Sequence, residues 1–280
     1  SASVGGTIVP SGNVLVPFGS NALFVIRPDS GYHVDSVIVD GVSQPPSSGY
    51  TFSAISANHV LRVTYAIDEF TILASAGPNG SISPVGSVTV NYGSSQLFTV
   101  QPAPGYHVDT LIVDGVLLPP ATSHLFASVM SNHSLRVTFA IDEFAISASA
   151  GPNGALSPSG VVIASYGGST VFTFTPSNGY HLDSLIVDGV NQSAAASYTF
   201  TNVTTAHTIR VTFAINVYTI TASSGTNGSI SPTGGVSVNH GNNQTFNFTP
   251  STGYHVDSVI VDGVNQIGRA SCRERVYSGV

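Results

Sequence analysis

The sequence contains no lysine and no tryptophan, and only one cysteine and one methionine among its 280 residues. Charged residues make up 8% of the chain, and the formal net charge of −7 is spread thinly, without a basic cluster. A chain without such a cluster has little to release counterions from a phosphate backbone, which argues against nucleic acid as a partner. A single cysteine cannot close a disulfide within the chain. No run of about 18 apolar residues is present, so we expect no membrane span.

Valine, threonine, serine, glycine and phenylalanine are abundant instead. The β-branched and aromatic residues among them suit pleated strands, and glycine suits turns. Apolar and polar residues alternate with a period of two, as in residues 135–139 and 172–175. This alternation is typical of half-buried antiparallel strands, so the sequence predicts an all-β protein.

The sequence repeats itself every 74 residues. Gly-Tyr-His recurs with its tyrosine at Tyr32, Tyr106, Tyr180 and Tyr254, and prolines and Asp-Gly pairs keep the same step. A unit of this length can bury a modest core of its own, so we expect small domains in series rather than coils of a solenoid. The predicted domains are residues 1–67 with a truncated first strand, residues 68–141, residues 142–215 and an incomplete fourth repeat at residues 216–266.

Each repeat is expected to contain roughly six or seven short strands. The apolar run 184–190 includes Asp188-Gly189, a pair that readily takes the positive φ angles of a two-residue hairpin turn. Residues around Asn79, Asn153 and Asn227, each followed by glycine, supply another turn early in the repeat.

A one-residue change in the alternation marks each joint between repeats. Leu61, Val63 and Tyr65 occupy odd positions, whereas Phe70 and Ile72 continue on even ones. Because side chains alternate with period two, the buried face flips, as expected where a strand leaves one core and enters the next. No linker rich in glycine, serine or proline intervenes, so we expect stiff joints and a rod-like array. The joints fall at Asp68-Glu69, Asp142-Glu143 and Asn216-Val217.

The run from Phe98 to Ala140 resembles the divergent InlB B-repeat family of bacterial surface and secreted proteins. The resemblance lies in Pro104-Gly105-Tyr106, Asp114-Gly115, Asn132-His133 and the closing segment 135–140. It covers the later half of the first three repeats and part of the fourth, although valine replaces the family's tryptophan before Asp-Gly. The resemblance implies spacer, stalk or adhesive modules and brings no catalytic residues with it. For the fold of one repeat, sandwich-like and β-grasp-like arrangements both stay open.

Residues 267–280 depart abruptly from the repeat. They hold three of the seven arginines and the only cysteine, Cys272. This segment resembles a translated sequencing-adapter read-through, as expected of a metagenomic fragment. A natural basic tail that docks on an acidic partner is the alternative.

Histidines and carboxylates offer the main candidates for chemistry. Each histidine of Gly-Tyr-His lies two residues before an aspartate, and on a strand these positions share a face. The pair could serve a metal or general-base catalysis. The four copies have no serine or cysteine nucleophile fixed beside them, so we favour a His-Asp hydrogen bond that steadies the hairpin. We expect the second histidine set to form surface ion pairs or caps. The first set is His33-Asp35, His107-Asp109, His181-Asp183 and His255-Asp257, and the second is His59, His133 and His207.

The paired carboxylates Asp68-Glu69 and Asp142-Glu143 suggest calcium-stiffened joints, since hard cations prefer clustered carboxylates. The third joint, Asn216-Val217, lacks both charges, so solvated turn residues are the better interpretation. The sequence therefore predicts no catalytic residues, no cofactor and no metal site.

The sequence favours a non-catalytic structural protein of the cell surface: an extracellular stalk, or a building block of a fibre or filament. Self-association end to end or side to side is expected, including strand addition where a repeat lacks a strand. The alternative is an adhesin or carbohydrate-binding module that recognises glycans or a host surface. In that case Tyr32, Tyr106, Tyr180 and Tyr254 would stack on sugars. An enzymatic function is not expected.

Overall fold

The computed structural model describes residues 1–267, and every regular element in that range is a β-strand. The all-β prediction is confirmed. The chain divides into two compact units, Ser1–Asp142 with the first two repeats and Glu143–Val280 with the rest. Of the segment expected to be foreign to the protein, residues 268–280 lie outside the described range.

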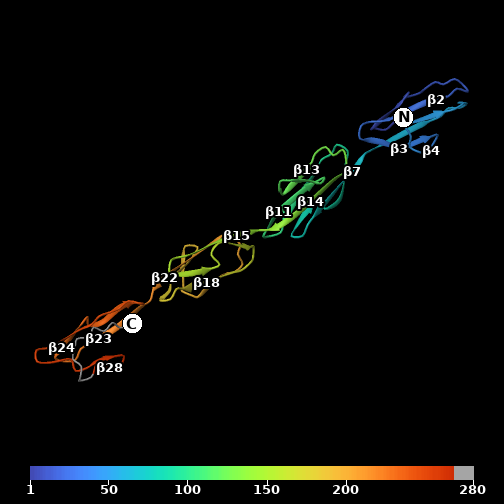
Figure 1. Ribbon diagram of the computed structural model, residues 1–280. Coiled ribbons are helices and arrows are strands. Elements are labelled where there is room, and N and C mark those ends of the chain that lie inside the picture. Colours follow the sequence, from blue (N-terminus) through green and yellow to red (C-terminus); the bar gives the residue numbers. More distant parts are fainter. Residues whose placement is uncertain (268–280) are drawn as a thin grey trace. The chain divides into compact units, whose positions relative to one another are not determined.

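The second repeat forms two sheets. One has the order β12-β11-β14-β7-β9 and the other the order β13-β10-β8. The strands are β7 (Glu69–Ala76), β8 (Gly80–Ser83), β9 (Gly86–Asn91), β10 (Gln96–Pro102), β11 (Tyr106–Val113), β12 (Val116–Leu118), β13 (Ser123–Phe126) and β14 (His133–Ile141). Neighbouring strands run antiparallel, with one departure from expectation: the last strand, β14, lies parallel to the first, β7. Figure 1 shows β7, β11, β13 and β14 together.

The third repeat has the same plan. Its sheets have the orders β17-β15-β22-β19-β20 and β16-β18-β21, and β15 and β22 again run parallel. The strands are β15 (Glu143–Ala150), β16 (Gly154–Ser157), β17 (Gly160–Ser165), β18 (Thr170–Pro176), β19 (Tyr180–Val187), β20 (Val190–Gln192), β21 (Ser197–Phe200) and β22 (His207–Ile215).

The first and fourth repeats contain fewer of these strands. The first has β1 (Gly6–Val9), β2 (Ala22–Pro28), β3 (Tyr32–Val39), β4 (Val42–Gln44), β5 (Gly49–Phe52) and β6 (Leu61–Ile67). Ala2 forms a single parallel bridge to Val63, where β7 pairs with β14 in the second repeat. The fourth has β23 (Val217–Ala222), β24 (Gly228–Ser231), β25 (Gly234–Asn239), β26 (Asn247–Pro250), β27 (Val259–Val261) and β28 (Val264–Ile267).

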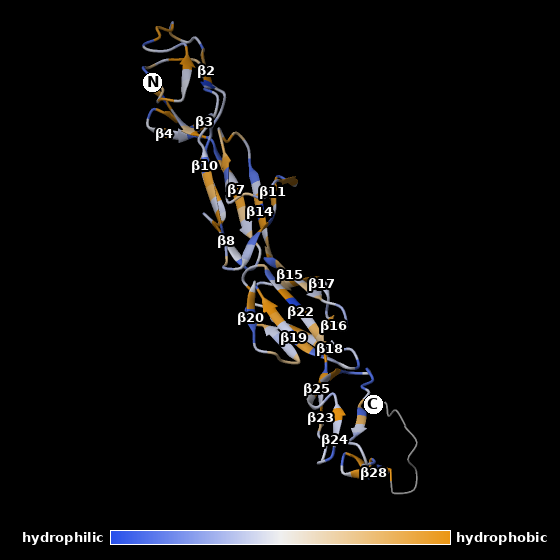
Figure 2. Cartoon of the chain, turned by 90° about the vertical axis from the view of Figure 1, so that its left-hand side faces the viewer, coloured by the Kyte–Doolittle hydropathy of each residue, from blue (hydrophilic) through white to orange (hydrophobic). Residues whose placement is uncertain are grey.

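The core of each complete repeat takes side chains from both sheets. In the third repeat Ile146 on β15, Phe172 on β18 and Val211 on β22 are fully buried in one cluster. Figure 2 colours the strands by hydropathy and shows apolar residues distributed along the strands of each repeat. Two sheets over a shared core make the first three repeats sandwich-like. A helix packed on a sheet, as a β-grasp fold needs, does not occur in residues 1–267.

The hairpins predicted at Asp-Gly are present. Asp40 has a φ of 51° and Gly41 a φ of 83°, and Val39 faces Val42 across the turn. Two consecutive residues with positive φ define the turn that matches the twist of the flanking strands. The equivalent aspartates Asp114, Asp188 and Asp262 each have a φ of 49°.

Replacing Phe172 with alanine should unfold the third repeat at lower temperature. The ring is fully buried, so its loss leaves a cavity and should cost about 3–5 kcal/mol. The control is Val171→Ala, because the neighbouring Val171 is 53% exposed and its truncation should change stability by no more than about 0.5 kcal/mol. Calorimetry of both variants measures the difference, and equal melting profiles would contradict the assigned core.

Candidate functional site

The joint between the first two repeats is built around Asp68, the single residue between β6 and β7. Its backbone N–H donates to the carbonyl oxygen of Gly31 in the first repeat at 2.8 Å, and its carbonyl oxygen accepts from the N–H of Tyr92 in the second repeat at 2.8 Å. Its carboxylate Oδ1 lies 2.8 Å from Nδ1 of His33. One residue therefore ties the loop before β3 to the loop after β9. We call Gly31, His33, Asp68 and Tyr92 the joint cluster.

The ring of Tyr92 rests directly on Gly31. A Cβ atom at Gly31 would lie 2.1 Å from Cδ1 of Tyr92, and the glycine has a φ of +79°, so both space and backbone conformation demand glycine here. The hydroxyls of Ser30 and Tyr92 are 3.1 Å apart and form a further link across the joint.

The second unit repeats this arrangement with different side chains. Asn216 N–H donates to the carbonyl of Gly179 at 2.8 Å, and His240 N–H donates to the carbonyl of Asn216 at 2.9 Å. Oδ1 of Asn216 lies 2.8 Å from Nδ1 of His181, and a Cβ at Gly179 would lie 2.2 Å from the ring of His240. Because a neutral amide can take the place of the carboxylate, the joint depends on hydrogen-bond geometry rather than on charge.

The residue of the second joint, Asp142, makes the same contacts within the second repeat. Asp142 N–H donates to the carbonyl of Gly105 at 2.8 Å, and its Oδ1 lies 2.7 Å from Nδ1 of His107. The residue after the last strand thus folds back onto the Gly-Tyr-His loop of its own repeat in each of the first three repeats.

The sequence placed the wrong aspartate beside the first histidine set. His33 bonds to Asp68, 35 residues away, whereas Asp35 Oδ2 accepts the hydroxyl of Thr64 at 2.8 Å. The reason is a β-bulge: the register of β3 against β6 shifts between Val34 and Ser36, which breaks the period-two alternation at Asp35. The same shift recurs in β11 and β19, where Asp109 and Asp183 also accept threonine hydroxyls.

The second histidine set forms the expected ion pairs. Nδ1 of His59 lies 2.6 Å from Oδ2 of Asp40, and His133 with Asp114 and His207 with Asp188 repeat the contact at 2.7 Å. The other oxygen of Asp40 accepts the N–H of Val60 at 2.7 Å. These bonds connect the Asp-Gly hairpin to the start of the last strand.

The same hydrogen bonds alter the acidity of the hairpin aspartates. The N–H of Val60 and then the imidazole of His59 lower the pKa of Asp40 below its usual value. At Asp114 burial opposes the change, but the bonds from His133 and Ser134 together outweigh it and lower the pKa. A carboxylate whose pKa is lowered by folding stabilises the fold in its charged form.

The carboxylates of the joints do not gather a metal site. Within residues 1–267 no three histidine, cysteine, aspartate or glutamate side chains lie close enough to share an ion. Asp68 faces His33, and asparagine stands at the equivalent position 216.

The tyrosines of Gly-Tyr-His are mostly not presented to solvent. Tyr32 is half-buried and lies over Gly5, where a Cβ would be 2.4 Å from its ring. Tyr106 and Tyr180 are also half-buried, whereas Tyr254 is 57% exposed. Stacking of these rings on sugars stays a prediction.

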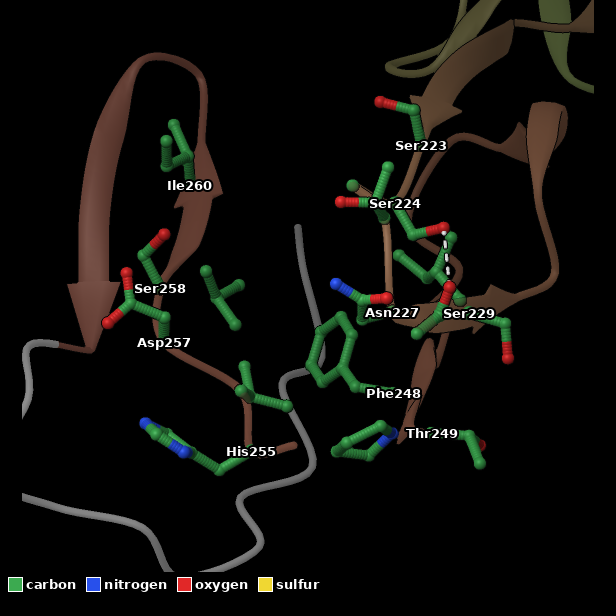
Figure 3. Close-up of a pocket in the computed structure, with 17 residues that line it drawn as sticks. Ser223, Ser224, Asn227, Ser229, Phe248, Thr249, His255, Asp257, Ser258 and Ile260 are labelled. Atoms are coloured by element: carbon green, nitrogen blue, oxygen red, sulfur yellow. Dashed lines mark hydrogen bonds between the residues drawn. The ribbon is translucent and has the colours of Figure 1, made fainter. Parts of the chain in front are cut away.

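A pocket of about 320 Å³ lies in the fourth repeat (Figure 3). Phe248 points into it from β26 and Ile260 lies on the β27–β28 hairpin, while His255 and Asp257 extend away from Phe248. The hydroxyl of Ser224 donates to the carbonyl of Gly228 at 3.3 Å at its edge. The pocket therefore has polar walls but no convergent set of groups that could carry out a reaction.

The position of this pocket has a structural explanation. In the third repeat β22 lies between β15 and β19, whereas the equivalent strands β23 and β27 of the fourth repeat have no strand between them in the described part of the chain. Residues equivalent to those that β22 covers in the third repeat therefore line the pocket in the fourth. Phe248 is half-buried, whereas its equivalent Phe174 is buried. We therefore assign no ligand to this pocket.

The sequence profile of the divergent InlB B-repeat domain matches residues 70–143, 144–217 and 218–272. The chain belongs to the divergent InlB B-repeat family. These B-repeats are typical of surface-associated proteins, and the family is typically non-catalytic. No helix in residues 1–267 is long and apolar enough to cross a membrane.

Comparisons beyond the family are distant. No curated protein sequence matches the chain. Among solved structures, the Bacillus anthracis TIE protein is similar over 90% of this chain and 70% of its own, with 8% identity and a TM-score of 0.34. The I9–I11 tandem of titin is similar over 70% of this chain and 93% of its own, with 8% identity and a TM-score of 0.13.

Sequence reasoning missed the contact between Tyr92 and Gly31, although a signal was present. Tyr92 and His240 occupy equivalent positions of the B-repeat, each before a glycine, and Gly31 and Gly179 precede the tyrosines of Gly-Tyr-His. Only the fold shows that the two positions meet, because they belong to successive repeats.

Asp40→Asn should reduce the loss of stability that the first B-repeat undergoes on acidification. Because folding lowers the pKa of Asp40, its contribution is fully present above the unfolded value of about 3.9 and is lost as the pH falls through the folded value. The variant should be less stable than the parent at neutral pH, and the difference should shrink below about pH 4.

Thermal unfolding across this pH range measures the effect. The control is Asp29→Asn, because Asp29 carries a carboxylate whose side chain makes no hydrogen bond within the described residues. A stability difference between Asp40→Asn and the parent that is the same at neutral and acid pH would contradict the assigned role.

Proposed function

We propose that this chain is a non-catalytic extracellular stalk of a surface protein, in which the joint within each compact unit holds the two neighbouring B-repeats in one fixed geometry. The observation that carries the proposal is the joint cluster of Gly31, His33, Asp68 and Tyr92, with its counterpart at Gly179, His181, Asn216 and His240. Family membership supports a surface-associated module.

The joint has the features that stiffness requires. A flexible linker would leave the backbone of the connecting residue solvated, whereas both backbone groups of Asp68 are bonded, one to each repeat. A close ring contact at Gly31 leaves no room for the two loops to slide past each other. A spacer made of such repeats keeps its length under thermal motion, which is what a stalk needs to present a distal domain.

The test is a distance distribution between spin labels in the first and second repeats. Thr51→Cys and Thr99→Cys, both at exposed strand positions, carry the labels in a Cys272→Ser background. The proposal expects one narrow distance distribution. Independent repeats would give a broad one and would overturn it.

Gly31→Ala should broaden that distribution. The added Cβ cannot coexist with the ring of Tyr92 in its present position, so the joint must open or shift. The matched control is Gly41→Ala: Gly41 has a similar φ of +83°, but a Cβ there meets nothing within 4 Å. Both variants incur the same backbone strain of about 1 kcal/mol, so only the joint contact distinguishes them. Equal widths for the two variants would show that the contact does not control the joint.

A further inference from the structure

The third repeat has an edge strand that lacks the usual protection. β17 (Gly160–Ser165) is the outermost strand of its five-stranded sheet and pairs only with β15. It contains no charged residue and no proline, the devices that usually blunt an edge. At six residues it is also longer than the edge strands β16, β20 and β21.

Both faces of β17 are apolar. Val162 and Ala164 face the core, whereas Val161 and Ile163 face outward and are 69% and 55% exposed. Ala145 lies opposite Ile163 on β15 and extends the apolar patch by one small side chain.

The equivalent edges of the neighbouring repeats are polar on this outward face. β9 presents Ser87 and Thr89 where β17 presents valine and isoleucine, and β25 presents Gly235 and Ser237. The strands β9, β17 and β25 are therefore equivalent and equal in length, but only β17 has an apolar outward face.

The outer hydrogen-bonding groups of β17 are available. Within residues 143–267 the only further backbone bond to this strand is from Gly168 N–H to the carbonyl of Ser165, at its end. A six-residue edge with free donors and acceptors is a template for one more strand.

We propose that β17 pairs antiparallel with β17 of a second copy of this chain. The strand is self-complementary: an arrangement centred on Val162 sets Val161 opposite Ile163 of the partner copy, and Ile163 opposite its Val161. Facing residues then lie on the same side of the sheet, as antiparallel pairing requires, whereas a shift by one residue would set an outward side chain against an inward one.

A second copy is the occupant that fits β17, because the strand pairs with itself in register and brings no like charges together. No charged side chain lies on the strand, and the nearest, Glu143, is opposite Ser165 at its end, so the two Glu143 side chains lie at opposite ends of the paired strands. The rest of the chain carries a net charge of −7, so two copies repel one another elsewhere. Pairing at β17 should therefore strengthen with ionic strength, because salt screens that repulsion. This lateral contact adds side-to-side association to the proposed stalk but does not depend on stiff joints.

Sedimentation equilibrium of the full chain over a range of concentrations tests the proposal. The parent should show a reversible monomer–dimer equilibrium. Val161→Ser with Ile163→Thr, which copies the outward face of β9, should weaken dimerisation, and Val161→Lys should weaken it at least about tenfold because the ammonium group is forced against the partner's isoleucine. The control is Val171→Ser, which removes a 53% exposed valine from β18 and should leave the dimer unchanged.

Disulfide trapping tests the register in a Cys272→Ser background. A mixture of Val161→Cys chains and Ile163→Cys chains should cross-link, because these positions face each other between copies, and Val161→Cys chains alone should not. A chain that stays monomeric at all concentrations, a dimer that survives Val161→Lys, or cross-linking without this preference would overturn the proposal. The outcome is separate from the spin-label result, which concerns two repeats of a single chain.

Discussion

The structure depends on one constraint: the buried face of the chain must change sides within a single residue as it passes from one repeat to the next. The last strand of one repeat and the first strand of the next are separated by Asp68 in the first joint and by Asn216 in the third. A connection of one residue keeps the two cores close together. The backbone N–H and C=O groups of that residue therefore need hydrogen-bond partners in both repeats. At Asp68, the carbonyl oxygen of Gly31 and the N–H of Tyr92 are these partners.

This constraint determines which residue types can stand at the joints. Glycine is needed at positions 31 and 179 because a ring from the next repeat occupies the space of a side chain. A hydrogen-bond acceptor is needed at positions 68 and 216 to engage the histidine of Gly-Tyr-His, and either a carboxylate or an amide suffices. The Gly-Tyr-His histidines of the first three repeats thus act as structural donors at the joints, and His59, His133 and His207 do so at the hairpins.

Much of the fold could be predicted from the sequence because its signals are local. Alternation with period two predicted the strands, and Asp-Gly predicted the hairpins. The parallel pairing of β7 with β14 could not be predicted, since it joins segments about 60 residues apart with no turn between them. The hydrogen bond of His33 to Asp68 could not be predicted either, because the bulge at Asp35 breaks the alternation on which the prediction relied. The apolar face of β17 was visible as sequence, but its position at a sheet edge was not.

If the joint cluster holds the first and second repeats as one body, the two repeats must reorient together. Residual dipolar couplings measured separately for the amides of the first and second repeats test it most directly, because each repeat reports its own alignment. We expect a single alignment tensor to fit both repeats of the first unit. Two tensors of different magnitude would show that the repeats reorient independently, and would contradict it.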